Sequence, residues 1–344
     1  MAAGYTTSLL LNAQAILAKR FESPEFRTER YNLIRMMLEN GNNMFLQTTI
    51  DELKTSDSRT VETFVLGKRS VTPGSARAHD HTLAAFGDSQ KVTLSFSIVS
   101  GTYGISLKMG GRNIFERSQL LAGDLMSAQI AINNTIEAAI AAYLAAQKTQ
   151  SNAASGSYSK MGEWDGTNFI WKIPVSEQNY MFQYISEVMA INDYDVPLIC
   201  VADPVAGAIA GQLQKQGQAN QNNLGWQFEN QQIIQSRRVA DSSYLATVYA
   251  IPAGTVGMVN RIPKENRDGA VTRLYTYGSM NDPLGTPLVM ATHEYEAGAS
   301  TYSTGGETQD VTTQLENSTD YALVKAPLTS AATDSTIFKF VLKA

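Results

Sequence analysis

The clearest pattern of apolar and polar positions runs over residues 117–148. Apolar side chains recur there at spacings of three and four, no proline interrupts them, and alanine is frequent in the second half. This periodicity predicts one long α-helix of about 48 Å at ~1.5 Å per residue. A narrow stripe suits a strut laid across a sheet, whereas a coiled coil would need charged flanking positions, which are scarce here. The stripe consists of Leu121, Leu125, Ala128, Ile132, Ile136, Ala139, Tyr143 and Ala146.

Residues 60–109 change to a period of two, which is typical of β-strands. A polar tip over 67–91 separates the strands and includes His79-Asp80-His81. The pattern predicts a long β-ribbon, and an isolated ribbon is only marginally stable in water. The ribbon therefore packs on its own chain or is completed by a neighbour. The alternating apolar set is Val61, Val65, Val92, Leu94, Phe96, Ile98, Tyr103, Ile105, Leu107 and Met109.

Two shorter amphipathic helices precede the ribbon, over 8–21 and 23–39. Ser23-Pro24-Glu25 supplies a helix start, and Asn40-Gly41-Asn42 supplies a left-handed stop. Because both helices come before any strand, we expect them to form an N-terminal arm or an outlying hairpin.

Residues 158–260 alternate between strand and helix patterns, which predicts an α/β unit. The continuous apolar run Leu198-Ile199-Cys200-Val201 predicts a buried strand within it. The Gln- and Asn-rich stretch 212–235 is expected to be mostly loop, with a strand beginning at Ile233. Further strands are expected at 271–277, 288–295, 321–324 and 337–342, so the predicted fold class is α+β.

Length and composition narrow the function classes. The 344 residues suggest two domains, or one large domain with extensions. Charged residues make up 17%, below the roughly 25% of average soluble chains, and Asn, Gln, Ser, Thr and Gly take their place. The net charge of −5 argues against a nucleic-acid-binding protein, because such proteins usually carry an excess of basic residues. One cysteine and three histidines leave no disulfide framework and little case for a metal centre. No secretory signal and no membrane-spanning run is expected.

Catalytic signatures are few. The chain has no phosphate-binding glycine loop, no G-x-S-x-G elbow and no H-E-x-x-H. Ser157 and Lys160 fit S-x-x-K, in which the lysine could activate the serine, but they lie in a Gly/Ser-rich loop. His79-Asp80-His81 could contribute metal ligands without a visible third one, and His293-Glu294-Tyr295-Glu296 is interpreted as a surface-facing strand. We predict no catalytic, cofactor-binding or metal residue.

The remaining polar features have simple interpretations. Cys200 is expected to be a buried structural thiol. Asp193 and Asp195 are expected in a turn, and Asn133 and Asn317 fit glycosylation sequons that matter only after secretion. Modest basic clusters suit ion pairs across an interface better than nucleic-acid reading, since aromatic residues are not interleaved. These clusters are Lys68-Arg69, Arg112 with Arg117, Arg237-Arg238, and Arg261 with Lys264 and Arg267.

The order of elements resembles the major capsid protein of tailed bacteriophages, which has the Hong Kong 97-type fold. The shared features are an arm, a long ribbon with a polar tip, one very long helix, an α/β region and a returning strand. The resemblance implies five segments along the chain. They are an N-terminal arm (1–49), an extended loop (50–110), a peripheral domain with the spine helix (111–174), an axial domain (175–300) and a C-terminal return to the peripheral domain (301–344).

The resemblance also implies a function and partners. The chain would assemble with itself into pentamers and hexamers, and these into an icosahedral head enclosing double-stranded DNA without sequence specificity. It would work with a separate scaffolding protein, a portal and decoration proteins, without a membrane, and be assembled in the host bacterial cytoplasm. The alternatives are an encapsulin-like compartment shell, a tail or tube component, a hydrolase using Ser157 and Lys160, and a carbohydrate- or peptide-binding α/β protein.

Overall fold

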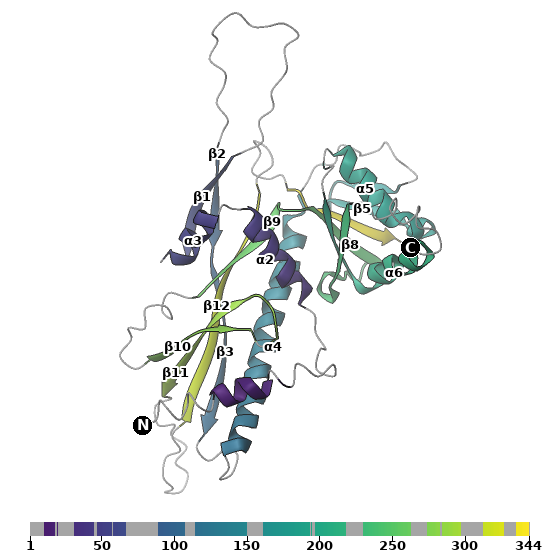
Figure 1. Cartoon of the computed structure of the whole chain (residues 1–344). Helices are drawn as coiled ribbons and strands as arrows, with labels where there is room; N and C mark the ends of the chain where they lie inside the picture. The colour runs from purple at the N-terminus through teal and green to yellow at the C-terminus, as the bar shows by residue number, and fades with distance from the viewer. Residues whose placement is uncertain are drawn as a thin grey trace, which may run out of the picture.

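The structure is a computed structural model in which one long helix, two larger sheets and a hairpin are arranged as an α+β fold (Figure 1). The predicted class is thus confirmed. The structure describes residues 10–17, 19, 31–44, 47–56, 58–66, 89–106, 114–149, 161–192, 194, 197–217, 230–262, 274–282, 284–296, 312–326 and 335–343.

The helical segments begin with a helix over residues 10–17. The others are α2 (Asn32–Met44), α3 (Gln47–Thr55), α4 (Ile114–Gln147), α5 (Met181–Ile191) and α6 (Pro204–Gly217), with the short 3-10 helices η2 (Val175–Tyr180) and η3 (Arg237–Val239). The strands are β1 (Thr60–Leu66), β2 (Ser89–Ser95), β3 (Ser97–Ser106), β4 (Glu163–Asp165), β5 (Ile170–Pro174), β6 (Leu198–Ala202), β7 (Gln231–Gln235), β8 (Ala246–Pro252), β9 (Val256–Arg261), β10 (Leu274–Asn281), β11 (Val289–Glu296), β12 (Thr312–Lys325) and β13 (Phe338–Lys343).

The long helix predicted at 117–148 is α4, with 34 residues. Four of the eight residues of its predicted stripe are buried (Leu121, Leu125, Ile132 and Ile136), and the C-terminal end of the stripe differs from the prediction. Ile140 and Leu144 are fully buried there, whereas Ala146 is exposed. The buried face follows the larger side chains because they remove more apolar surface from water than alanine does.

Beneath α4 lies a five-stranded sheet in the order β10-β11-β12-β3, with β9 paired to the other end of β12. The 14-residue strand β12 is its centre, since it pairs antiparallel with β11, β3 and β9. Tyr103 and Leu315 pack from this sheet against Leu121 and Leu125 of α4, together with the helix over 10–17. Alternate residues of β12 therefore face α4, as a period of two requires.

The α/β unit contains a six-stranded mixed sheet in the order β4-β5-β13-β8-β6-β7. Strand β6, which lies between β8 and the edge strand β7, is buried along its whole length, as the apolar run predicted. Ile199 and Val201 face α4 and α2 through one hydrophobic cluster. Leu198 and Cys200 face α5 and α6 through another. Both faces of the sheet are thus covered, which explains why the strand is apolar without alternation.

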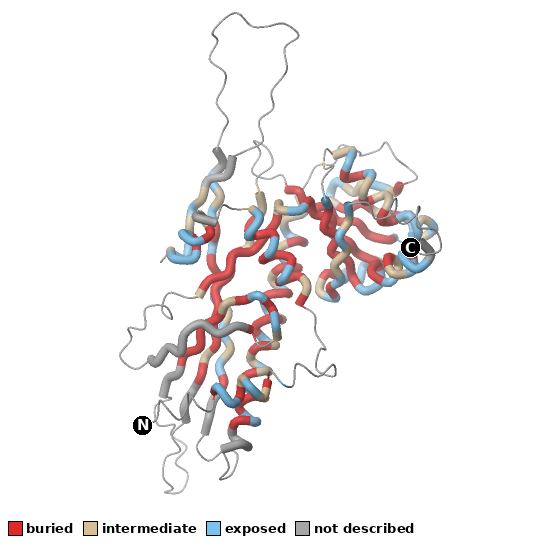
Figure 2. Tube along the Cα trace, viewed as in Figure 1, coloured by how far each residue is buried: buried red, intermediate tan, exposed pale blue. Residues whose placement is uncertain are grey.

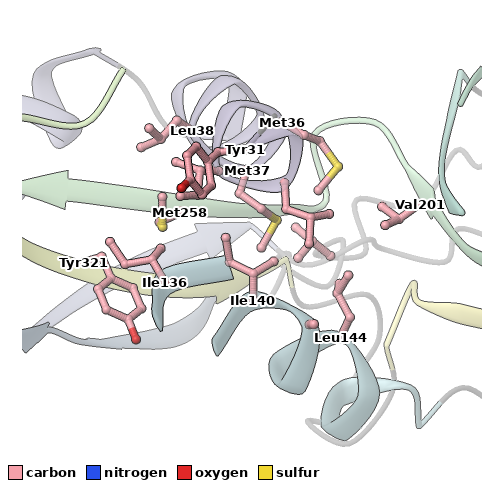
Figure 3. Close-up of a cluster of buried hydrophobic side chains, with 14 of the residues drawn as sticks. Tyr31, Met36, Met37, Leu38, Ile136, Ile140, Leu144, Val201, Met258 and Tyr321 are labelled. Atoms are coloured by element: carbon pink, nitrogen blue, oxygen red, sulfur yellow. The ribbon is translucent and has the colours of Figure 1, made fainter. Parts of the chain in front are cut away.

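One hydrophobic cluster joins the two sheets. Ile140 and Leu144 of α4 pack with Met36 and Met37 of α2, and Val201 of the α/β sheet lies in the same cluster (Figure 3). Figure 2 shows buried residues continuing between the two sheets. The two larger sheets therefore share one of the hydrophobic clusters.

The N-terminal helices differ from the predicted arm. α2 begins at Asn32 and continues through Gly41 to Met44, so Asn40-Gly41-Asn42 is not a helix stop. Leu33 and Ile34 are fully buried in the core, which makes α2 an integral part of the body. The amphipathic pattern was right, but the face it predicted is covered by the chain's own β9 and α4. The predicted helix start at Ser23-Pro24-Glu25 lies outside the described residues.

Three other segments depart from the expected ranges. β3 falls in the predicted extended loop 50–110, yet it pairs with β12 instead of extending the β1–β2 hairpin. β9, β10 and β11 fall in the predicted range 175–300 but belong to the sheet beneath α4. β13 falls in the predicted return 301–344, yet it lies between β5 and β8 of the α/β sheet. In each case long-range strand pairing, which local periodicity does not encode, decides the location.

Candidate assembly elements

The β1–β2 hairpin is a separate two-stranded sheet that is not paired with either of the two larger sheets (Figure 1). Seven residue pairs join the strands, from Thr60 with Ser95 to Leu66 with Ser89. Glu62 and Lys91 are diagonal neighbours across the strands and form an exposed ion pair with an O–N distance of 2.5 Å. At this exposure the pair contributes little to stability. The predicted polar tip, His79-Asp80-His81 included, lies outside the described residues apart from its last three positions.

The base of the hairpin is held by a buried arginine, Arg261 of β9. Its Nε lies 3.2 Å from Oδ2 of Asp320 on β12, and both side chains are almost fully buried. Its Nη1 donates to the carbonyl oxygen of Ser56, just after α3, at 2.8 Å. Its guanidinium lies 3.8 Å from the ring centroid of Phe96, between β2 and β3. One side chain thus joins α3, the hairpin base and the central sheet through charge-assisted and cation–π contacts.

Hydrophobic packing reinforces this base. Leu94 and Phe96 pack against Val259, Ala322 and other apolar residues on the sheet face opposite α4. Sequence reasoning placed Arg261 in an interface cluster of basic residues. That interpretation is wrong for Arg261, because its partner is an internal carboxylate. A charged residue at the end of an apolar strand was the available signal, but it does not identify the partner.

A buried polar network lies between α4 and the β10–β11 connection. Nε2 of Gln129 donates to Oδ1 of Asn133, and Nδ2 of Asn133 donates to Oδ2 of Asp282 at 2.8 Å. The hydroxyl of Thr286 and the backbone N–H of Leu284 also donate to Asp282. Burial nevertheless raises the pKa of Asp282, because these donors offset only part of the lost hydration. The network orients α4 relative to the sheet.

A carboxylate of α4 also caps α2. Oε1 of Glu137 accepts a hydrogen bond of 3.3 Å from the backbone N–H of Leu33, in the first turn of α2. The first N–H groups of a helix have no partner within the helix, and they form the positive end of the helix dipole. A carboxylate is therefore favoured at this position. Glu137 is buried, so this contact fixes α2 on α4 in the interior.

A groove of about 370 Å³ lies between α2 and the outer strand β7 of the α/β sheet. Nδ2 of Asn32 lies 3.5 Å from the carbonyl oxygen of Gln235 at one end of it. Arg35 is exposed beside the groove and donates to the carbonyl oxygen of Gly285 at 2.9 Å. The groove is lined by Asn32, Arg35, Met36 and Glu39 of α2 and by residues 232–235 of β7.

The candidate chemistry from the sequence is distributed over the chain and is not brought together. Ser157 and Lys160 lie outside the described residues, as do Asp193 and Asp195. His293 lies on a strand, β11, but it is buried, so the interpretation as a surface-facing residue is wrong. Within the described ranges, no group of three His, Cys, Asp or Glu side chains is arranged to hold a metal. None of the helices described has the length and apolarity of a membrane span.

Cys200 is fully buried, as predicted, and burial raises the pKa of its thiol to about 12. The two sequon residues have internal roles. Asn133 donates to Asp282, and Oδ1 of Asn317 accepts hydrogen bonds from the hydroxyls of Tyr103 and Thr292. Both asparagines are fully buried, so these polar positions of α4 and β12 form hydrogen bonds inside the chain.

The other basic clusters are only partly described. Nη2 of Arg238 donates to Oδ1 of Asn134 on α4 at 2.7 Å. This contact joins η3 to the long helix and is internal to the chain. Lys68-Arg69, Arg112, Lys264 and Arg267 lie outside the described residues.

No protein-family model matches the chain, and no curated protein matches its sequence. Solved structures do match. A chain from the capsid of Ralstonia phage GP4 is 10% identical with a TM-score of 0.45, covering 85% of this chain and 86% of that one. A chain from the cyanophage A-1(L) capsid asymmetric unit is 9% identical with a TM-score of 0.45, covering 87% and 94%. A chain from Mycobacterium phage Che8 is 10% identical with a TM-score of 0.42, covering 88% and 90%.

Proposed function

We propose that the chain is the major capsid protein of a tailed bacteriophage and has a structural, non-enzymatic role. It assembles with itself into pentamers and hexamers and then into an icosahedral shell around double-stranded DNA. The observation that carries the proposal is the β1–β2 hairpin. It forms a two-stranded sheet whose base is firmly anchored by Arg261 and Phe96, while both edges of its strands have no further partner strand in the described part of the chain.

A hairpin of two strands has little core of its own, so its natural partner is the surface of another subunit. Contacts of this kind are heterologous, and they close into rings when the rotation between neighbours allows it. Many weak contacts acting together stabilise a closed shell. The low charge of the chain agrees with interfaces in which amides and hydroxyls find partners or bridging water.

The partners and location follow from the same proposal. A separate scaffolding protein, a portal and decoration proteins would act with the shell, which would assemble in the host bacterial cytoplasm and remain in the virion. The β1–β2 hairpin would serve as the extended loop, and α4 would serve as the spine helix. The α/β unit, which includes β13, would serve as the axial domain.

The test replaces residues 67–88 with Asn-Gly. Leu66 and Ser89 are paired, and a two-residue Asn-Gly turn closes such a hairpin, so all seven residue pairs remain. We expect a folded subunit that forms no closed shells in size-exclusion chromatography and negative-stain microscopy, alongside wild-type chain that does. If the chain with the shortened hairpin forms normal shells, the assembly role proposed for the hairpin is wrong.

Two alternatives are distinguished by further measurements. An encapsulin-like compartment would enclose a protein cargo, so nuclease-protected DNA inside purified particles supports the phage capsid. The hydrolase alternative predicts that Ser157→Ala abolishes a measurable activity. We expect Ser157→Ala to assemble like the wild type.

A further inference from the structure

The outer edge of β7 presents backbone groups without a neighbouring strand in the described part of the chain. β7 is the last strand of its sheet and pairs only with β6. The carbonyl of Asn230 accepts from Leu198, and the N–H of Ser236 donates to Ala202, so both residues turn toward β6. Backbone groups alternate along a strand, and residues 231, 233 and 235 therefore turn outward. The contact from Asn32 to the carbonyl oxygen of Gln235 agrees with this direction.

The sequence of this edge lacks the charge and the proline that commonly keep sheet edges from pairing. Natural edge strands are commonly blunted by charged residues, by proline or by being very short. The sequence of β7 is Gln-Gln-Ile-Ile-Gln, with no charge and no proline. The opposite edge of the same sheet, β4, has three residues and carries Glu163 and Asp165. Of the two edges, β7 is the one suited to accept another strand.

The groove beside β7 fits one extended chain. The backbone edge of residues 232–235 forms one wall, and α2 forms the other, with a volume of about 370 Å³ between them. An added strand advances about 3.3 Å per residue, so about four residues would lie along this length of β7. A strand edge flanked by a helix is a known arrangement for peptide binding by β-strand addition. The wall formed by α2 leaves no room for a second sheet.

The charges around the groove favour a neutral occupant. Arg35 and Glu39 lie one turn apart on the exposed side of α2 and balance each other, while Met36 and Ile234 contribute apolar surface. Residues 1–9 of this chain, Met-Ala-Ala-Gly-Tyr-Thr-Thr-Ser-Leu, contain no charged side chain. Tyr5, Thr6 and Thr7 are of types favoured in strands.

We propose that the groove between α2 and the outer edge of β7 binds residues 1–9 of a second copy of this chain as an added β-strand. This inference rests on the proposed shell function, in which neighbouring copies lie side by side. The outward N–H and C=O groups of residues 231 and 233 pair with alternate residues of the incoming segment, whereas the carbonyl oxygen of Gln235 already lies 3.5 Å from Nδ2 of Asn32.

The test uses the full-length chain before assembly and a fluorescent peptide of residues 1–9. Two further peptides carry backbone N-methyl groups, one at Ala3, Tyr5 and Thr7 and the other at Gly4, Thr6 and Ser8. Only one of these sets faces β7 in an added strand. We expect saturable binding in fluorescence anisotropy, with at least a tenfold loss for one methylated peptide and less than a twofold loss for the other. Absence of binding, or equal losses for both peptides, overturns the proposal.

A variant of the groove gives an independent readout. Ile233→Pro removes an outward N–H and leaves the residues that bond to β6, and proline is tolerated on such an edge. We expect at least a tenfold weaker binding of the unmodified peptide, whereas the control variant Gln178→Ala, exposed on η2 outside the groove, binds like the wild type. Unchanged binding by a folded Ile233→Pro chain contradicts the proposal, and if that variant does not fold, the methylated peptides still decide.

Deletion of residues 2–9 separates this inference from the proposed function. Normal shells from the deleted chain, with no peptide binding, would overturn the groove assignment and leave the capsid function in place. Alternating sensitivity of the peptides in a chain that never forms shells would overturn the capsid function and support the groove.

Discussion

Gly41 of α2 and Gly257 of β9 lie backbone against backbone, with no side chain between helix and strand. A Cβ atom on Gly257 would lie 2.5 Å from the backbone nitrogen of Gly41, and one on Gly41 would overlap the carbonyl oxygen of Met258. The pair lets α2 approach β9 closely, so that Met37 and Met258 enter one hydrophobic cluster. The glycine that seemed to end a helix in the sequence instead serves this close approach.

We expect Gly257→Ala to lower the free energy of unfolding of the unassembled subunit by about 1–3 kcal/mol, since the neighbouring atoms are rigid backbone. Chemical denaturation measures the change. Gly123→Ala in α4 is the matched control, because a Cβ there meets no atom within 4 Å. Alanine is a better helix former, so the control should be neutral or up to about 1 kcal/mol more stable. Equal destabilisation by both variants would contradict the close approach.

We expect Arg261→Met to lower the free energy of unfolding by about 3–5 kcal/mol, because it leaves Asp320 buried without its cation. Arg261→Lys should not restore stability, since lysine lacks the fork that reaches both Asp320 and Ser56. Hydrogen exchange should increase first at the hairpin base, over residues 56–66 and 89–96. The exposed pair Glu62–Lys91 provides the control, and Lys91→Ala should change stability by less than about 1 kcal/mol. Unaltered exchange at the hairpin base in Arg261→Met would disprove the anchoring role.

The raised pKa of Asp282 predicts that the stability of the chain depends on pH. Burial raises its pKa, so the folded chain holds this proton more tightly than the unfolded chain does. Stability from this group is present at low pH and is lost as pH rises from the ordinary Asp pKa through the raised one. The free energy of unfolding of Asp282→Asn, relative to the wild type, should therefore increase over that interval. Denaturation curves at a series of pH values measure it.

Asp165 is the control of opposite sign. Hydrogen bonds from Asn168 and then Lys172 hold its pKa below the usual range. Its contribution is present above the ordinary Asp pKa and is lost as pH falls through the lowered one. The relative stability of Asp165→Asn should thus decrease with rising pH. Parallel pH profiles for the two variants would refute the assignment of at least one of the two carboxylates.

The rate at which the Cys200 thiol is chemically modified measures how often the α/β unit opens. Its thiol is fully buried with a pKa raised to about 12, so almost no reactive thiolate is present at neutral pH. We expect maleimide to modify the native subunit only as fast as the unit unfolds, and immediately in denaturant. Rapid labelling of the native chain, with its circular dichroism unchanged, would show that the thiol is accessible.

The spacing of apolar residues predicted those helices and strands whose formation depends on nearby sequence alone. The long helix, the strands of the hairpin and the buried strand at Leu198 follow from apolar spacing, which is set by the geometry of helix and strand. The location of α2 does not follow, because the same stripe suits a neighbouring subunit or the chain's own sheet. Likewise, Phe338–Lys343 is evidently a strand, but its place between β5 and β8 depends on contacts with residues far away in sequence.

The candidate assembly elements were predicted less completely. The hairpin was expected from its alternation, whereas the partners of Arg261 lie more than 50 positions away and cannot be identified from the local sequence. The groove at β7 was missed because the Gln-rich stretch that contains it was expected to be mostly loop. Its two central isoleucines were the only sign of a strand.

The continuity of α4 has a mechanical consequence. Leu121 and Leu125 tie one end of the helix to the helix over 10–17, and Ile140 and Leu144 tie the other end to the core shared with the α/β sheet. Its 34 residues make a lever of about 51 Å at ~1.5 Å per residue, so a tilt of about one degree displaces the far end by roughly 0.9 Å. Such a lever converts a small rotation at one end into a larger displacement at the other, and in the proposed shell this displacement would change the curvature of the surface.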